Sequence, residues 1–355
     1  MNKVKLLIID DSAIIRHSLR QLLDNDPQIQ VVGTAINAQI ASKKIQLYKP
    51  DVLLLDINMP GIDGLTFLKQ LMRYNPLPVV IFSSYAPSGS FNALKALSLG
   101  ALEIINKPIL KSESDLLDYK NRLRQAILSA ASADLSKAIK LSKAVENKSQ
   151  PSLKKTHLSN TPNKDIQIIA IGASTGGTEA IRYILSKLPP NMPPITIVQH
   201  MPVEFTKSFA QNLDSVSQLH VQQTDSRQQA LSGNVYIAPG NKHLIVQRFN
   251  NRLFVQPDDS PPLNRFKPSI DKLFLSVAQA AGSKAIAILL TGMGDDGVKG
   301  MKRLFLQGAI TIAQDRDTSV VYGMPKEAIQ QGAAKHVMSL FKIPDFLATF
   351  AKKKD

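Results

Sequence analysis

The stretch that decides the fold is Ile166–Ile181, which reads IQIIAIGASTGGTEAI. Its first six residues form an apolar run rich in β-branched side chains, as expected for a buried parallel strand. A Gly-rich segment, 172–177, follows, and residues 178–181 begin a helix-like pattern. Glycine permits a sharp turn that other side chains would block, and the N-terminus of the next helix offers free N–H groups. The sequence therefore predicts a strand, turn and helix that hold the hydroxyl of Ser174 at the carboxyl end of a sheet.

Two functions fit this segment by itself. Gly172-x-Ser174-x-Gly176 has the spacing of a nucleophile elbow, in which N–H groups of the following turn stabilise an oxyanion. A Gly-rich turn before a helix also binds nucleotide phosphates. A purely structural turn is a third interpretation. The segment alone leaves a serine nucleophile and a phosphate-binding loop equally open.

The composition restricts the class of protein. A chain of 355 residues predicts about two or three domains. The absence of cysteine excludes disulfides, Cys-ligated zinc and a Cys nucleophile, and it agrees with a reducing, cytoplasmic location. No apolar run reaches the roughly 18 residues of a membrane helix, and the first residues do not resemble a secretory signal. We therefore expect a cytoplasmic protein that is not embedded in a membrane.

The formal net charge of +15 is unevenly distributed. Residues 120–165 hold 10 Lys and Arg against 3 Asp and Glu, and from residue 147 this segment is rich in Ser, Pro, Asn, Gln and Lys. Such a composition cannot bury enough apolar surface to offset ordering entropy. We interpret 120–165 as a basic, flexible interdomain linker that begins with a loose helical stripe. No helix-turn-helix or zinc-finger pattern accompanies the charge, so nucleic-acid binding is not expected.

Residues 1–119 alternate strand and helix patterns five times, which predicts a doubly wound parallel sheet. In such sheets ligands bind beyond the carboxyl ends of the strands. Five polar residues follow or end the predicted strands: Asp10, Asp11, Asp56, Ser83 and Lys107. Carboxylates suit Mg²⁺, and the metal and the lysine together would neutralise a phosphoryl group in transfer to one carboxylate.

This constellation resembles a response-regulator receiver domain. The segment 56–64, DINMPGIDG, is similar to that family's phosphoacceptor segment, and Asn106-Lys107-Pro108 to its lysine segment. The resemblance implies that Asp56 accepts a phosphoryl group from a histidine kinase. It also implies that Lys107 contacts the phosphoryl group and Ser83 senses it. The implied Mg²⁺ ligands are Asp11, Asp56 and the carbonyl of Asn58, with Asp10 assisting.

Residues 166–350 give a second α/β pattern, followed by a basic tail at 351–355. After the opening strand and helix, parallel strands are expected at 195–198, 219–223, 285–290 and 309–313. Segments 233–240, 243–247 and 252–256 are expected to form short strands with turns, as an antiparallel edge. The predicted fold class is thus two doubly wound, mainly parallel-sheet domains joined by a flexible linker.

A second constellation follows the strands of this half. Ser174, His200 and the pair Asp295/Asp296 could supply a nucleophile, a base and an orienting acid. The chain has six histidines; His200 is favoured because it ends an apolar strand, and His243 is its rival. Spacing does not separate Asp295 from Asp296. The order Ser, His, Asp differs from that of α/β-hydrolases, which argues against that fold but not against the chemistry.

Residues 166–350 resemble the catalytic domain of the chemotaxis protein-glutamate methylesterases. The similar segments are Ile171–Gly177, Gln199–Pro202, Ile237–Gly240, Lys267–Asp271, Leu290–Gly297 and Val321–Pro325. The resemblance implies that Ser174 is the nucleophile, His200 the base and Asp296 the acid. It further implies that the Met293 N–H stabilises the oxyanion and that the Thr175 hydroxyl positions His200.

The implied activity is hydrolysis of glutamate methyl esters on methyl-accepting chemotaxis receptors, with deamidation of selected receptor glutamines. Phosphorylation of Asp56 would regulate it, and ester hydrolysis would need no cofactor. Two other functions stay open: a receiver joined to a nucleotide-binding domain, and a basic regulator that binds DNA or protein. The first lacks a Walker lysine after Gly177, and both leave His200 and Asp296 without a role.

Overall fold

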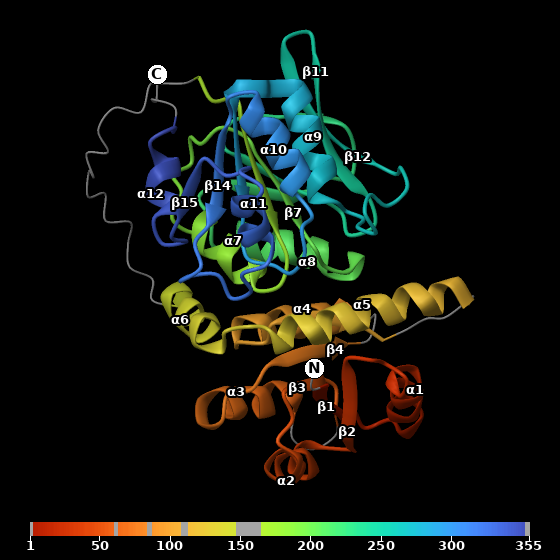
Figure 1. Cartoon of the computed structure of the whole chain (residues 1–355). Coiled ribbons are helices and arrows are strands. Elements are labelled where there is room, and N and C mark those ends of the chain that lie inside the picture. The colour runs from red at the N-terminus through yellow and green to blue at the C-terminus, as the bar shows by residue number, and fades with distance from the viewer. Residues whose placement is uncertain (1–2, 60–62, 84–86, 108–112, 147–164, 352–355) are drawn as a thin grey trace. The chain divides into compact units, whose positions relative to one another are not determined.

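The computed structural model describes residues 3–59, 63–83, 87–107, 113–146 and 165–351 (Figure 1). The chain divides into two compact units, Met1–Ser142 and Lys143–Asp355. Residues 147–164 of the basic linker predicted at 120–165, and residues 352–355 of the basic tail, lie outside the described residues. The two units are described separately below.

The first unit contains a five-stranded parallel sheet in the order β2-β1-β3-β4-β5. The chain goes from β1 to β2 on one side and then crosses to β3 on the other side of β1, so the sheet reverses its winding between β1 and β3. The strands are β1 (Val4–Ile9), β2 (Ile29–Ala35), β3 (Val52–Asp56), β4 (Val79–Ser83) and β5 (Glu103–Asn106). The helices are α1 (Ala13–Leu23), α2 (Ala38–Tyr48), α3 (Gly64–Tyr74), α4 (Pro87–Ser98), α5 (Glu113–Ala131) and α6 (Leu135–Glu146). The doubly wound parallel sheet predicted for this part of the chain is confirmed.

The first unit extends past residue 119, where the sequence suggested that the linker begins. Helix α5 continues to Ala131, and its side chains Leu123 and Ile127 are fully buried. Arg124 forms an ion pair with the buried Asp26, with 3.0 Å between Nε and Oδ2. The apolar stripe that was expected to belong to a linker therefore packs onto the body of the first unit.

The second unit is built on a seven-stranded parallel sheet in the order β15-β14-β13-β6-β7-β10-β8. After β6 the chain adds β7 on one side, and β13 later pairs on the other side, so the reversal of winding lies between β6 and β13. The strands are β6 (Ile168–Ala173), β7 (Ile195–Gln199), β8 (His220–Gln223), β10 (Asn234–Ile237), β13 (Ala285–Leu289), β14 (Ile310–Gln314) and β15 (His336–Met338). The helices are α7 (Gly177–Leu185), α8 (Val203–Asp214), α9 (Ile270–Ala281), α10 (Val298–Leu306), α11 (Met324–Gln330) and α12 (Ile343–Ala348), with the 3₁₀ helix η1 (Gly282–Lys284).

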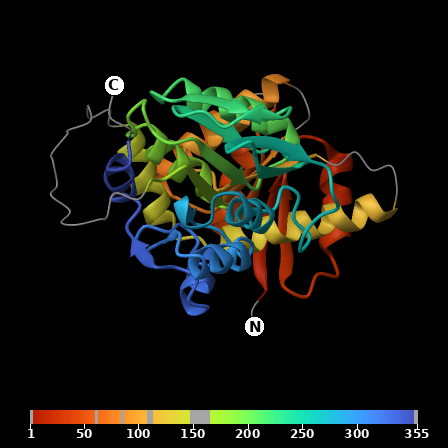
Figure 2. The ribbon, with the colours of Figure 1, turned by 90° about the horizontal axis from the view of Figure 1, so that it is seen from above.

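One expectation about this unit is wrong. Segment 233–240 was expected to join an antiparallel edge, but its strand β10 lies inside the parallel sheet, between β7 and β8. Only β11 (His243–Phe249) and β12 (Arg252–Asp258) form the antiparallel hairpin, which makes a separate sheet with β9 (Gln228–Gln229). The hairpin lies beside α9, whose Ser276 hydroxyl accepts a hydrogen bond from the Val246 N–H at 3.0 Å (Figures 1 and 2). β10 has only four residues, and so short a strand carries little information about its partner strand, which long-range packing decides.

Gly172 shows why the sheet and α9 can approach so closely. A Cβ built at this position in β6 would lie 2.2 Å from Cγ2 of Ile270, the first residue of α9. Ile270 is fully buried, so it has no free space into which to move. The glycine in the strand is therefore required by packing, and it brings the N-terminus of α9 against the end of β6.

Replacing Gly172 by Ala should destabilise the second unit by about 1–3 kcal/mol, because an overpacked core has to shift to accept the methyl group. The same change at Gly33 is the control, since a Cβ there approaches the ring of the exposed Tyr48 at 3.0 Å, and Cδ1 of Leu7 at 3.4 Å, which is an ordinary contact distance. Calorimetric unfolding of the full chain measures both variants. Equal and small effects of the two changes would contradict the packing argument.

Candidate functional site

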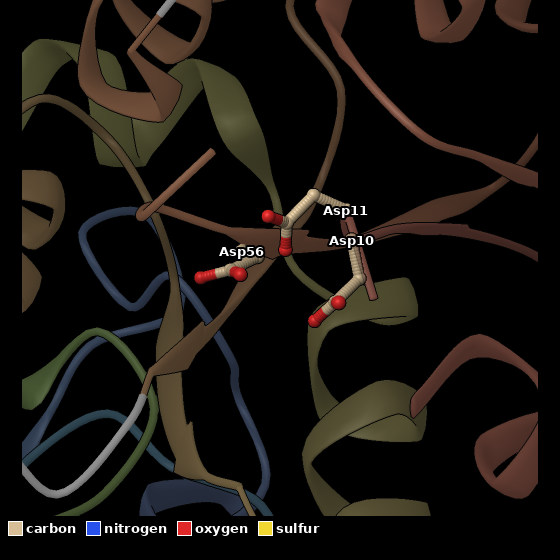
Figure 3. Close-up of side chains that lie close together, drawn as sticks. All are labelled: Asp10, Asp11 and Asp56. Carbon is tan, nitrogen blue, oxygen red and sulfur yellow. The ribbon is translucent and has the colours of Figure 1, made fainter. Parts of the chain in front are cut away.

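Three carboxylates gather at the reversal point of the first sheet. Asp10 and Asp11 follow β1, and Asp56 is the last residue of β3; their ligand atoms all lie within 4.8 Å of one another (Figure 3). Asp10 and Asp56 are buried, whereas Asp11 is exposed. The arrangement brings together all three predicted acidic residues, and its exposed member leaves one side open to solvent.

Lys107 supplies a cation to this cluster. Its Nζ lies 2.8 Å from Oδ2 of Asp10 and 2.7 Å from Oδ2 of Asp56. Burial lowers the pKa of Lys107, but its hydrogen bonds and charge interactions with the two carboxylates outweigh this, so the pKa lies above its ordinary value. Burial raises the pKa of Asp56 above its ordinary value, against the opposing effects of Lys107 and the Asn58 N–H. One lysine thus only partly compensates three carboxylates.

The surrounding residues fit a divalent cation. The three side chains that could bind a metal all offer carboxylate oxygens, which is the ligand type that Mg²⁺ prefers. Together with Lys107 they carry a net negative charge. The exposed Asn58 lies next to the cluster, since its N–H donates to Oδ1 of Asp56 at 2.9 Å. Ser83 is buried at the end of β4, and its carbonyl accepts the Lys107 N–H at 2.8 Å. Pro60 and Pro108, which belong to the two similar segments, lie outside the described residues.

In the second unit, Ser174 follows β6 at the reversal point of the sheet. Its N–H donates to the carbonyl of Thr291, beyond β13, at 3.0 Å. A Cβ built on Gly292 would lie 2.6 Å from Cβ of Ser174, so that only glycine fits beside the serine. The side chain of Ser174 is half-buried, at the place where open α/β sheets bind their ligands.

His200 and Asp296 are in direct contact. His200 follows β7, and its Nε2 lies 2.9 Å from Oδ2 of Asp296, a residue only 1 % exposed. The Asp296 carboxylate also accepts hydrogen bonds from the Ser269 hydroxyl at 2.8 Å and from the N–H of Ile270 at 2.8 Å and of Asp271 at 3.0 Å. Burial raises the pKa of Asp296, but the interactions with His200 and the two N–H groups outweigh it and hold the pKa below its ordinary value.

The structure separates the residues that spacing left ambiguous. Asp295 is exposed, whereas its neighbour Asp296 is buried. His243 is fully buried, and both of its nitrogens are used: Nδ1 accepts the Ser269 N–H, and Nε2 donates to the carbonyl of Pro261, each at 3.1 Å. Burial lowers the pKa of His243, which favours the neutral ring that these two bonds require. His243 therefore joins two parts of the backbone and does not reach Ser174.

Sequence reasoning missed two residues that hold this site together. Ser269 begins α9 as its N-cap, and it also donates to Asp296. Gln199 is buried, and its Nε2 donates to the carbonyl of Ser174 at 2.9 Å and to that of His200 at 3.1 Å. The available signal for Gln199 was an amide side chain at the end of a mainly apolar strand. Its amide connects the backbone of the two strand ends.

The remaining expected residues lie close to Ser174. Thr175 is 2 % exposed, and its carbonyl accepts a hydrogen bond from the Thr291 hydroxyl at 2.9 Å. Met293 is half-buried and directly follows Gly292, which packs against Ser174. Backbone N–H groups of this turn are therefore near the serine side chain.

A carboxylate cluster with a lysine in one doubly wound sheet, and a Ser/His/Asp set in another, define a two-domain response regulator with a hydrolase-like second domain. Comparisons with known proteins agree. Residues 6–119 match the family model for the response regulator receiver domain, and residues 169–347 match that for the CheB methylesterase. The chain belongs to the CheB methylesterase family.

Curated relatives match along almost the whole chain. A protein-glutamate methylesterase/protein-glutamine glutaminase from Hydrogenovibrio crunogenus is 43% identical over 99% of this chain and 100% of its own length. A second one, from Vibrio vulnificus, is 44% identical over 97% of each chain. The crystal structure of the Thermotoga maritima CheB methylesterase catalytic domain has a TM-score of 0.51 and 42% identity, covering 52% of this chain and 98% of that one. The described residues contain no helix that is long and apolar enough to cross a membrane.

The buried Asp271 predicts how the stability of the second unit depends on pH. Burial raises its pKa to about 6, although the Gly300 N–H in α10 donates to its Oδ1 at 2.8 Å. A raised pKa means that the protonated form is favoured on folding. The stabilisation is fully present below the unfolded pKa of about 4 and is lost as the pH rises through about 6. Between pH 4 and 7, the free energy of unfolding of Asp271→Asn should therefore fall by about 2–3 kcal/mol less than that of the wild type.

Urea unfolding of wild type and Asp271→Asn at several pH values tests this, since the difference between the two isolates Asp271 from other titrating groups. The asparagine can still accept the Gly300 N–H. Parallel stability curves for the two proteins would contradict a raised pKa at Asp271.

Proposed function

We propose that this chain is a phosphorylation-regulated serine esterase that hydrolyses glutamate methyl esters on chemotaxis receptors to glutamate and methanol. The observation that carries the proposal is the buried contact between His200 and Asp296 beside the half-buried Ser174. The family membership and the names of the relatives support the substrate class.

We assign a role to each nitrogen of His200. Nε2 faces the carboxylate of Asp296, so Nδ1 is the nitrogen that takes a proton from Ser174. Ser174 Oγ attacks the γ-carbonyl carbon of the methyl ester, and its proton passes to His200. The proton then moves to the departing methoxide, so that methanol leaves and an acyl-enzyme forms. Water attacks the acyl-enzyme by the same route, which restores the serine and releases the glutamate side chain.

The surrounding groups stabilise charge in this reaction. Asp296 keeps its negative charge through its four hydrogen bonds, and it stabilises the imidazolium that forms on His200. We assign the Met293 N–H to the oxyanion, because the preceding Gly292 packs directly against Ser174. We assign the buried Thr175 to positioning His200.

Deamidation of receptor glutamines is a second proposed activity of the same site. An amide passes through a tetrahedral species like that of the ester, with ammonia in place of methanol as the leaving group. The relatives' names include protein-glutamine glutaminase, which favours this assignment.

Regulation is assigned to the first unit. We propose that Asp56 accepts a phosphoryl group from a histidine kinase, with Lys107 in contact with it and Ser83 sensing it. Asp10, Asp11, Asp56 and the carbonyl of Asn58 would hold Mg²⁺, which supplies positive charge for phosphoryl transfer. At this site Lys107 supplies a positive charge from the protein itself, since its Nζ contacts both buried carboxylates.

Ser174→Ala should lower methanol release from methylated receptor membranes by about 10⁴-fold or more, because the nucleophile is lost. Ser215→Ala is the control, since this exposed serine only donates to the carbonyl of Asn212. Methanol is measured with and without a small-molecule phosphodonor. A Ser174→Ala protein that keeps most of its release would exclude the serine mechanism.

Asp56→Asn should abolish labelling of the chain as an acyl phosphate by the kinase and remove the stimulation of methanol release by phosphodonor. Asp24→Asn, at an exposed residue of the same unit, should change neither. A chelator should abolish labelling of the wild type, because the three carboxylates then lack their cation. Labelling that persists in Asp56→Asn would mean that another residue accepts the phosphoryl group.

A further inference from the structure

The imidazole of His200 is covered on one face by an aromatic ring. The rings of His200 and Phe266 stack with their centroids 4.4 Å apart and their planes 5° from parallel. The hydrogen bond to Asp296 acts at the edge of the imidazole, whereas the stack acts along its normal. Together the two contacts fix both the position and the plane of the ring, and so the direction of its Nδ1.

A short turn places Phe266 in this position. Phe266 and Leu263 exchange backbone hydrogen bonds of 2.9 and 3.1 Å around the two residues Asn264 and Arg265. These two residues have φ of 50° and 72°, a region that side chains other than glycine rarely adopt. Such a backbone persists only where the surrounding structure holds it. The turn therefore has to be fastened from outside.

Contacts with residues outside the segment 259–269, and one ion pair within it, hold this turn in place. In the turn itself, Asn264 Nδ2 donates to Oδ2 of Asp271 at 3.4 Å. His243 joins the two halves of the segment, through the carbonyl of Pro261 and the N–H of Ser269. Lys267 Nζ contacts the carbonyl of Asp259 at 3.0 Å and its Oδ1 at 2.7 Å. The end of the segment is Ser269, whose hydroxyl donates to Asp296. One continuous segment thus contacts both the imidazole and the carboxylate of the proposed catalytic pair.

We propose that the segment 259–269 is a positioning loop and that Phe266 is its positioning residue, which holds the His200 ring in the plane required for proton transfer with Ser174. This inference rests on the proposed function of the second unit. It also assigns a role to His243: this buried, neutral histidine holds the loop through its two hydrogen bonds and takes no part in the reaction. The two positive-φ residues of the turn have a role as well, because they bring Phe266 against the imidazole.

The test compares Phe266→Leu with Phe266→Tyr in the full-length chain, with methanol release from methylated receptor membranes as the readout. Leucine keeps an apolar side chain but has no ring to stack. We expect kcat to fall about tenfold in Phe266→Leu, with KM within about twofold of wild type, because the ring plane affects proton transfer and not receptor binding. Phe266→Tyr should stay within about twofold of wild type in both constants.

A second readout separates positioning from receptor recognition. The probe is a small sulfonyl fluoride. Its expected reaction with the Ser174 hydroxyl releases fluoride and needs the same proton transfer to His200, but not the receptor-binding surface. Its inactivation rate constant should fall about tenfold in Phe266→Leu and stay near wild type in Phe266→Tyr. Phe249→Leu is the matched control, since Phe249 is 56% exposed on β11 and packs against Phe254, and it should change neither readout.

Thermal unfolding of each variant shows that it is folded before kinetics are compared. An unchanged kcat in folded Phe266→Leu would overturn the proposal. So would a raised KM with an unchanged inactivation rate, because Phe266 would then be a receptor contact. Ser174→Ala is measured in parallel: if it loses methanol release while Phe266→Leu keeps it, the positioning loop alone is wrong. If Ser174→Ala keeps release, the serine mechanism fails and this inference fails with it.

Discussion

The structure of the second unit depends on one constraint: the buried carboxylate of Asp296 needs hydrogen-bond donors. Asp296 is almost completely shielded from water, and an unpaired charge there would be costly. Its donors come from His200 at the end of β7 and from the start of α9. Satisfying this one group therefore brings β7, the turn after β13 and the N-terminus of α9 to the same point. The contact with His200 is one of the bonds that keep the carboxylate ionised.

The first unit shows the opposite balance of charges. Its three carboxylates share Lys107, and burial leaves the pKa of Asp56 raised, whereas that of Asp296 is lowered by a nearly complete set of donors. A site with its hydrogen bonds satisfied suits a group that must stay charged and fixed. A site left short of positive charge suits a group that must receive a cation and a phosphoryl group. The two arrangements thus agree with the proposed role of Asp296, which orients His200 and stabilises its charged form, and with the proposed acceptor role of Asp56.

Both sites lie where a parallel sheet reverses its winding. At such a point the connections that follow two neighbouring strands run to opposite faces of the sheet, which leaves a space beyond the ends of these strands. Asp10 and Asp56 end up on neighbouring strands in one sheet, as Ser174 and the turn beginning at Thr291 do in the other. The same topology therefore provides two kinds of chemistry, and the local side chains decide which.

The sequence by itself determined the strands, the glycine turns and the residues at the strand ends, because these follow from local periodicity and steric rules. The boundaries of β1 and the turn at Ser174 needed no distant partner. Residue spacing did not separate Asp295 from Asp296; the resemblance implied Asp296, and the tertiary structure places that residue against His200, 96 positions away. Only the tertiary structure decided that β10 lies inside the parallel sheet. It also decided that Phe266 covers the imidazole. Contacts between residues so far apart depend on how the elements pack, which no local pattern records.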